Sequence, residues 1–113
     1  RVQYVLYPGL ENHPGYEINK AQTTGFGGMI SFAVDSAETA RQILEGVKLI
    51  KFAESLGGTE SLITYPIRQT HTDLTAEECA EKGITDCLLR FSTGIEATQD
   101  LIDDLAQAFT AVE

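Results

Sequence analysis

The sequence predicts an α+β domain in which a mostly antiparallel sheet carries helices packed on one face. Short β-prone segments alternate with amphipathic helical segments along the chain, and glycine or proline signals separate them. About five short strands and four helices are expected. Residues 1–113 fit a single domain, because domains commonly contain about 100 to 150 residues.

The N-terminal half contains two predicted strands, each followed by a helical segment. Residues 2–7 are β-prone and end at a proline–glycine turn, which cannot continue a strand ladder. Residues 15–23 tolerate a helix, and residues 29–34 form an apolar run of strand length. Ser36 is a suitable N-cap for a helix through Gly46. Its buried face is predicted to contain Ala37, Ala40, Ile43, Leu44 and Val47.

The C-terminal half adds three strand-like segments and two helices. The predicted strands are residues 49–53, 61–65 and 87–92, and the helices are residues 76–82 and 98–112. Thr75 and Glu78 match a capping box, in which the two side chains satisfy each other's free backbone donors. The last helix places Leu101, Leu105, Phe109 and Val112 on one side. We expect the acidic side chains of this region, Glu96, Asp100, Asp103 and Asp104, to form a solvated face.

Charge and composition exclude several classes of function. A net charge of −9 argues against nucleic acid or an anionic membrane as partner, because both require a basic surface. The sequence has no apolar run of membrane-spanning length and no signal-peptide pattern, so we expect a cytoplasmic protein. Cys79 and Cys87 have no ligand-spaced neighbours and predict neither a metal site nor a disulfide framework. The chain begins with Arg1 directly before a strand, which suggests a piece of a longer protein.

Few residues indicate chemistry by themselves. The glycines of residues 25–28 precede a strand, whereas a dinucleotide fingerprint needs them between a strand and a helix. His13 and His71 fit hydrogen-bonded loop residues better than ligands or bases. Arg90 interrupts an apolar strand, so its guanidinium must reach solvent, pair with an acid or meet a ligand.

Several ordered blocks resemble the cystathionine gamma-synthase family of trans-sulfuration enzymes, which depend on pyridoxal 5′-phosphate. The strongest blocks are Ala53–Ile63, similar to the A-E-S-L-G-G-x-E-S-L signature, and Arg90–Glu96, similar to R-[LI]-S-x-G-[IL]-E. The other matching blocks are Tyr7–Leu10, His13–Pro14, Gly25–Met29, Thr70–His71 and Asp100–Leu105. The resemblance covers nearly the whole chain.

The resemblance implies a small C-terminal domain of a fold-type I enzyme, without the large domain that holds the cofactor. None of Lys20, Lys48, Lys51 and Lys82 lies in a context similar to the family's Schiff-base motif. The chain alone is therefore expected to be inactive and to hold no pyridoxal phosphate. The implied partners are its own missing large domain, further copies in a homo-oligomer (the family tetramer) and an amino-acid substrate.

Four residues match substrate-binding positions of the family. The resemblance implies that Arg90 grips the α-carboxylate of the amino acid and that Ser55 lies beside this carboxylate site. It implies that Glu54 lies near the distal end of the substrate, where it could favour an amino group. Thr70 matches a threonine near the site without an assigned role. A planar, permanently charged guanidinium suits bidentate carboxylate binding.

Within the family, a cystathionine gamma-synthase is the first expectation, with cysteine replacing the γ-substituent of an activated homoserine in methionine biosynthesis. This assignment is favoured by Thr93, the pair Tyr65–Pro66 and the run Gln69–Thr70–His71. A cystathionine beta- or gamma-lyase or a methionine gamma-lyase is the alternative, and sulfhydrylases share the same signature. A non-catalytic interaction module is the alternative from another class. The motifs leave the acyl group of the homoserine open.

Overall fold

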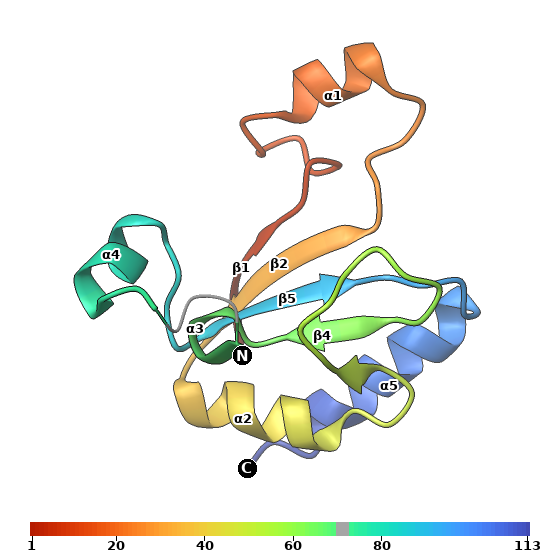
Figure 1. Ribbon diagram of the computed structural model, residues 1–113. Helices are drawn as coiled ribbons and strands as arrows, with labels where there is room; N and C mark the ends of the chain where they lie inside the picture. Colours follow the sequence, from red (N-terminus) through yellow and green to blue (C-terminus); the bar gives the residue numbers. More distant parts are fainter. Residues whose placement is uncertain (70–72) are drawn as a thin grey trace.

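A five-stranded sheet forms the centre of the computed structural model, which describes residues 1–69 and 73–113 (Figure 1). The strands are β1 (Val2–Leu6), β2 (Met29–Val34), β3 (Lys51–Phe52), β4 (Leu62–Thr64) and β5 (Leu88–Ser92), in the spatial order β1-β2-β5-β4-β3. Neighbouring strands pair antiparallel except β3 and β4, which pair parallel. The predicted fold class is confirmed.

The long helices α2 (Ala37–Gly46) and α5 (Thr98–Thr110) lie together on one face of the sheet (Figure 1). A Cβ on Gly46 would lie 3.3 Å from the backbone and side chain of Ala108, so glycine permits the close approach of the two helices. The Gln107 side chain donates to the Gly46 carbonyl at 2.6 Å. The core between helices and sheet is built from Phe32, Val34, Ala40, Ile43, Ile50, Ile63, Leu89, Phe91, Leu101 and Ala108.

Local capping signals are confirmed at two helices. The Ser36 hydroxyl accepts a hydrogen bond from the Thr39 backbone at 3.1 Å and begins α2. Thr75 and Glu78 form the predicted capping box at the start of α4 (Ala76–Glu81). Such caps satisfy backbone donors that a helix leaves free at its N-terminus.

Two sequence expectations were wrong. A short helix, α3 (Pro66–Gln69), follows β4 where the sequence predicted only the end of a strand; proline fits the first turn of a helix because its missing N–H is not needed there. Asp104 does not lie on a solvated face, because only 7% of it is exposed. Its carboxylate accepts hydrogen bonds from the backbone N–H groups of residues 48, 49 and 50 at 2.8–2.9 Å.

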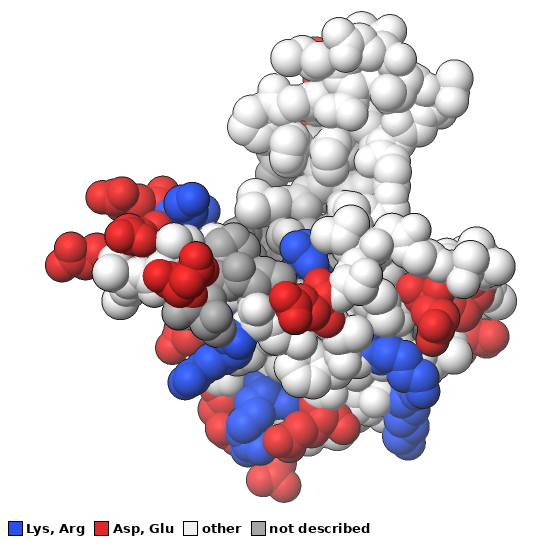
Figure 2. Space-filling model, viewed as in Figure 1, with Lys and Arg blue, Asp and Glu red and all other residues white. Residues whose placement is uncertain are grey.

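Residues 7–28, here called the arm, extend away from the sheet and contain helix α1 (Tyr16–Gln22) (Figure 1). The rings of Tyr16 and Phe26 stack at 5.5 Å, and the Tyr7 hydroxyl donates to the Gly27 carbonyl at 2.9 Å. Figure 2 shows that the visible face of the arm is almost free of charged side chains, whereas acidic and basic groups alternate over the body. Among the described residues, no helix is both long and apolar enough to cross a membrane.

Candidate functional site: an arginine on the helix-free face

Arg90 lies at the centre of the sheet, on the face opposite α2 and α5. Successive side chains of a strand point to opposite faces. Leu89 and Phe91 belong to the core beneath the helices, so Arg90 between them points the other way. The strand register places Ser31 of β2 and Thr64 of β4 directly beside it.

The connection between β3 and β4, residues 53–61, holds the guanidinium and is here called the β3–β4 loop. The Nη2 atom of Arg90 donates to the Glu54 carbonyl oxygen at 3.0 Å and lies 3.4 Å from Thr64 Oγ1. Thr64 Oγ1 itself donates to the Ala53 carbonyl at 2.6 Å. The Nε atom of Arg90 is buried and has no hydrogen-bond partner among residues 1–69 and 73–113.

Arg90 differs from two other arginines in its lack of a charged partner. Arg1 pairs with Asp35 at 3.2 Å, and the exposed Arg41 pairs with Glu38 and Glu45 on helix α2. Within residues 1–69 and 73–113, Arg90 forms no ion pair with a carboxylate, although the chain contains 17 acidic residues. The structural ion pair considered from the sequence is therefore wrong for the described residues, and a half-buried positive charge is left uncompensated.

A set of short polar side chains fastens the β3–β4 loop to β5 and to the residues that follow it. Ser92 Oγ accepts from the Gly57 backbone at 2.9 Å. The Glu96 carboxylate accepts from Ser61 twice, from the backbone N–H at 2.8 Å and from the hydroxyl at 2.6 Å. These hydrogen bonds from Ser61 hold the pKa of Glu96 below its usual value. A Cβ on Gly94 would collide with the carbonyl oxygen of Thr59, so the contact requires glycine.

Three other predicted substrate-binding residues have different outcomes. Glu54 and Ser55 lie at the start of the β3–β4 loop, and both are exposed. Glu54 touches Arg90 through its carbonyl oxygen. Ser55 makes no hydrogen bond in the described part of the chain. Thr70, together with His71, lies outside the described residues. The structure therefore brings Arg90, Glu54 and the β3–β4 loop together.

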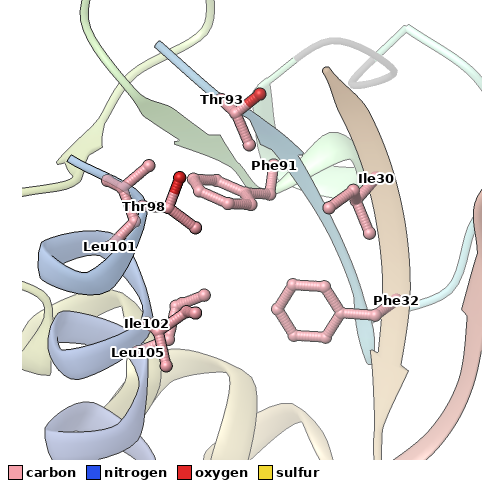
Figure 3. Close-up of a pocket in the computed structure, with 8 residues that line it drawn as sticks. All are labelled: Ile30, Phe32, Phe91, Thr93, Thr98, Leu101, Ile102 and Leu105. Carbon is pink, nitrogen blue, oxygen red and sulfur yellow. The ribbon is translucent and has the colours of Figure 1, made fainter. Parts of the chain in front are cut away.

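An apolar groove on the opposite face is separate from this site. It has a volume of about 270 Å³ and lies between the sheet and α5. Figure 3 shows Ile30, Phe32 and Phe91 from the sheet pointing toward Leu101, Ile102 and Leu105 of the helix. Without a charged lining group, the groove does not suit a carboxylate, and Arg90 lies on the other side of the sheet.

Ser61, Ser92 and Glu96 belong to the family-like motifs, but the sequence predicted no role in the site for them, and Glu96, expected on a solvated face, is half-buried against Ser61. Ser61 and Ser92 are 0% and 3% exposed, which is unusual for serine. The sequence did contain a signal for both serines, because each is a small polar residue at one end of an otherwise apolar strand. Their partners lie about 35 positions away along the chain, and no local pattern predicts such a pairing.

The chain's lysines do not fit a site for pyridoxal phosphate. Lys20, Lys48, Lys51 and Lys82 are all exposed, and Lys20 lies over the Tyr16 ring at 5.8 Å. An amine that holds a carbonyl cofactor is commonly activated by desolvation or by a neighbouring cation. None of the four has the buried setting that such activation requires, so no chemical step is assigned to the cofactor on this chain.

The sequence and the fold agree with one family of known proteins. The model of the family described as Cys/Met metabolism PLP-dependent enzyme matches residues 1–110. The chain belongs to this family. The Cys/Met metabolism enzymes are PLP-dependent, so the sequence-based resemblance is confirmed at the level of the family.

Known family members resemble the chain in sequence and structure. Cystathionine gamma-lyase of Bacillus subtilis (strain 168) is 51% identical over 107 residues, which cover 95% of this chain and 28% of the relative. The crystal structure of cystathionine gamma-lyase from Lactobacillus plantarum complexed with L-serine has a TM-score of 0.92 and 39% identity, covering 98% of this chain and 29% of that one. Cystathionine gamma synthase from Xanthomonas oryzae pv. oryzae, in complex with cystathionine, has a TM-score of 0.89 and 44% identity over 96% of this chain and 28% of that one.

The chain thus spans less than a third of the length of these relatives. Relatives named as lyases and relatives named as synthases both resemble the chain, so the comparisons do not select one reaction.

Proposed function

We propose that this chain is the substrate-binding C-terminal domain of a PLP-dependent trans-sulfuration enzyme, in which Arg90 binds the α-carboxylate of an amino acid. The observation that carries the proposal is the half-buried guanidinium, which has no acidic partner in the described part of the chain. A buried N–H without an acceptor costs about 1–3 kcal/mol, so an anionic ligand at this position would remove a real penalty.

The guanidinium is already oriented before a ligand arrives. The Glu54 carbonyl and the Thr64 hydroxyl accept from Nη2 and restrict rotation of the side chain, while the buried Nε–H finds no acceptor among the described residues. Binding of a carboxylate to a guanidinium that is already oriented costs less conformational entropy than binding to a mobile side chain. In this proposal the chain binds and orients the substrate, and the cofactor supplies the electron sink from the rest of the enzyme.

The remaining parts of the proposal concern the complete protein. The share of each relative that the chain covers supports a large domain elsewhere in the protein, with residues 1–113 as one domain of it. That large domain would be the chain's direct partner and would carry the Schiff-base lysine, and the whole enzyme would be a cytoplasmic homo-oligomer. Ser55 and Thr70 are proposed to lie beside the bound carboxylate, and Glu54 near the distal end of the substrate.

Two reactions at the γ-carbon are candidates. A cystathionine gamma-synthase, the expectation from the sequence, would join activated homoserine and cysteine. A cystathionine gamma-lyase is favoured by a different observation, the 51% identity to the Bacillus subtilis enzyme.

A product assay on the full-length protein tests the proposed function. With cystathionine alone, a gamma-lyase should release cysteine, 2-oxobutanoate and ammonia, whereas a beta-lyase should release homocysteine, pyruvate and ammonia. With acylated homoserine plus cysteine, a synthase should form cystathionine. Mass spectrometry distinguishes these outcomes. Turnover of none of these substrates by a cofactor-loaded protein would contradict the assignment to trans-sulfuration.

The isolated 113-residue chain should not hold pyridoxal phosphate at a specific lysine, because each of its lysines is exposed. Visible absorbance after mixing, followed by borohydride reduction and peptide mapping, measures this. Weak labelling spread over several lysines is the expected result. A stoichiometric adduct at one of Lys20, Lys48, Lys51 or Lys82 would show that the chain carries a cofactor site of its own.

A further inference from the structure

Glu96 lies where it can control the orientation of Arg90 without touching it. Its two carboxylate oxygens accept from two donors of one residue: Ser61 N–H binds Oε1 at 2.8 Å and Ser61 Oγ–H binds Oε2 at 2.6 Å. Ser61 is fully buried and is the last residue of the β3–β4 loop. Glu96 therefore fixes the end of the loop that enters β4.

The same serine links Glu96 to the backbone that follows β5. Ser61 Oγ accepts from the Gly94 backbone at 2.8 Å, so its hydroxyl proton is directed to Glu96. The Ile95 backbone N–H donates to the Thr59 carbonyl at 3.0 Å. Two segments separated by more than 30 positions are thus joined by several hydrogen bonds around one carboxylate.

The other end of the loop contacts the guanidinium. Arg90 Nη2 donates to the Glu54 carbonyl, and the neighbouring Ala53 carbonyl accepts from Thr64 Oγ1, which also faces Nη2. Among the described residues, the acceptors of Arg90 are a loop carbonyl and the Thr64 hydroxyl, which is itself bonded to that loop. The position of the guanidinium consequently depends on the position of the loop.

We propose that Glu96 is a positioning residue, which holds the β3–β4 loop through Ser61 and thereby fixes the direction in which Arg90 presents its guanidinium to a substrate carboxylate. This inference rests on the proposed function of Arg90. Protonation does not release the loop near neutral pH, because the hydrogen bonds from Ser61 keep the pKa of Glu96 below its usual value.

The test compares Glu96→Gln with the parent in the full-length, cofactor-loaded enzyme. Glutamine has the same shape, but its NH₂ group faces one of the two Ser61 donors, so one hydrogen bond is replaced by a repulsive contact. Each enzyme is assayed with an amino-acid substrate and with the α-amide of that substrate. We expect kcat/KM for the acid to fall at least about tenfold, chiefly through KM, and kcat/KM for the amide to change less than about twofold. The acid preference, which is the ratio of kcat/KM for the acid to kcat/KM for the amide, should therefore fall.

A matched control separates positioning from simple loss of stability. Asp104→Asn also removes a carboxylate that binds backbone donors, but it lies on the helix side of the sheet. It should lower the melting temperature while leaving the acid-to-amide preference unchanged. An equal loss of preference in both variants would mean that Glu96 acts only on general stability.

A second background shows whether Glu96 acts through Arg90. In Arg90→Ala, the additional change Glu96→Gln should alter kcat/KM by less than about twofold, because residues acting as one unit are not additive. A tenfold further loss in that background would overturn the inference. If Glu96→Gln does not fold, Ser61→Ala decides: a retained acid preference overturns the inference. Retention of the acid preference in the single variant Arg90→Ala would contradict the proposed function of Arg90. If Arg90→Ala loses the preference but Glu96→Gln retains it, the proposed function stands and the positioning role of Glu96 is contradicted.

Discussion

Arg90→Ala in the full-length enzyme should lower kcat/KM at least about 100-fold while cofactor absorbance and melting temperature remain close to the parent. A hydrogen bond to a charged group contributes about 1.5–3 kcal/mol, so the loss of a bidentate carboxylate contact is sufficient for this factor. The fold should tolerate the change, because the described residues provide no ion pair that the substitution would break. Steady-state kinetics with the substrate identified by the product assay measure the effect.

Arg90→Lys tests the geometry of the guanidinium, and Arg41→Ala is the control for loss of an arginine elsewhere. Lysine keeps the charge but loses the planar fork, so Arg90→Lys should recover only part of the lost rate. Arg41 is exposed and pairs with Glu38 and Glu45 on α2, so Arg41→Ala removes an arginine from the helix-covered face of the sheet, opposite Arg90 (Figure 1). It should leave kcat/KM unchanged. Unfolding of Arg90→Ala, or kcat/KM within a few-fold of the parent, would contradict the role of Arg90 as a carboxylate anchor.

The order of elements was predictable because local signals carry it. The serine before α2, and the threonine before α4 with the glutamate in its first turn, satisfy backbone donors only one turn away, and both caps form as expected. His13 likewise accepts from the Gly15 backbone at 2.9 Å, as a hydrogen-bonded loop residue should. Interactions that close within a few residues leave a pattern in the sequence.

The arrangement of the site was predictable only in part. Arg90 could be singled out because a charge in an apolar strand needs a partner, and the family motif implied a carboxylate as that partner. The support around it could not be identified, since Ser61 meets Glu96 and Gly57 meets Ser92 across 35 positions. Nor did periodicity show that β3 and β4 run parallel, because two-residue and three-residue strands carry almost no pattern.

Asp104 illustrates why a charge in an amphipathic helix can be misinterpreted. Its neighbours Asp100 and Asp103 are exposed, and helical position alone did not separate Asp104 from them. The decisive partners are three consecutive backbone donors after α2, which need an acceptor because the helix has ended. The carboxylate of Asp104 caps that segment from a distance of more than 50 residues.

Asp104→Asn should therefore lower the free energy of unfolding by about 2–3 kcal/mol, because buried donors lose charged acceptors. Burial alone would raise the pKa of Asp104, but the hydrogen bonds from the backbone N–H groups of Ile50, Lys48 and Leu49 outweigh it, and the pKa in the folded state lies below its usual value. A lowered folded pKa means that this stabilisation is complete above the unfolded-state pKa and is lost as pH falls through the folded value. Urea unfolding is followed by circular dichroism at pH 7 and below pH 4. The difference in free energy of unfolding between the parent and Asp104→Asn should be smaller in acid than at pH 7. A difference that stays constant over this range, or is absent at pH 7, would mean that the Asp104 charge does not stabilise the fold.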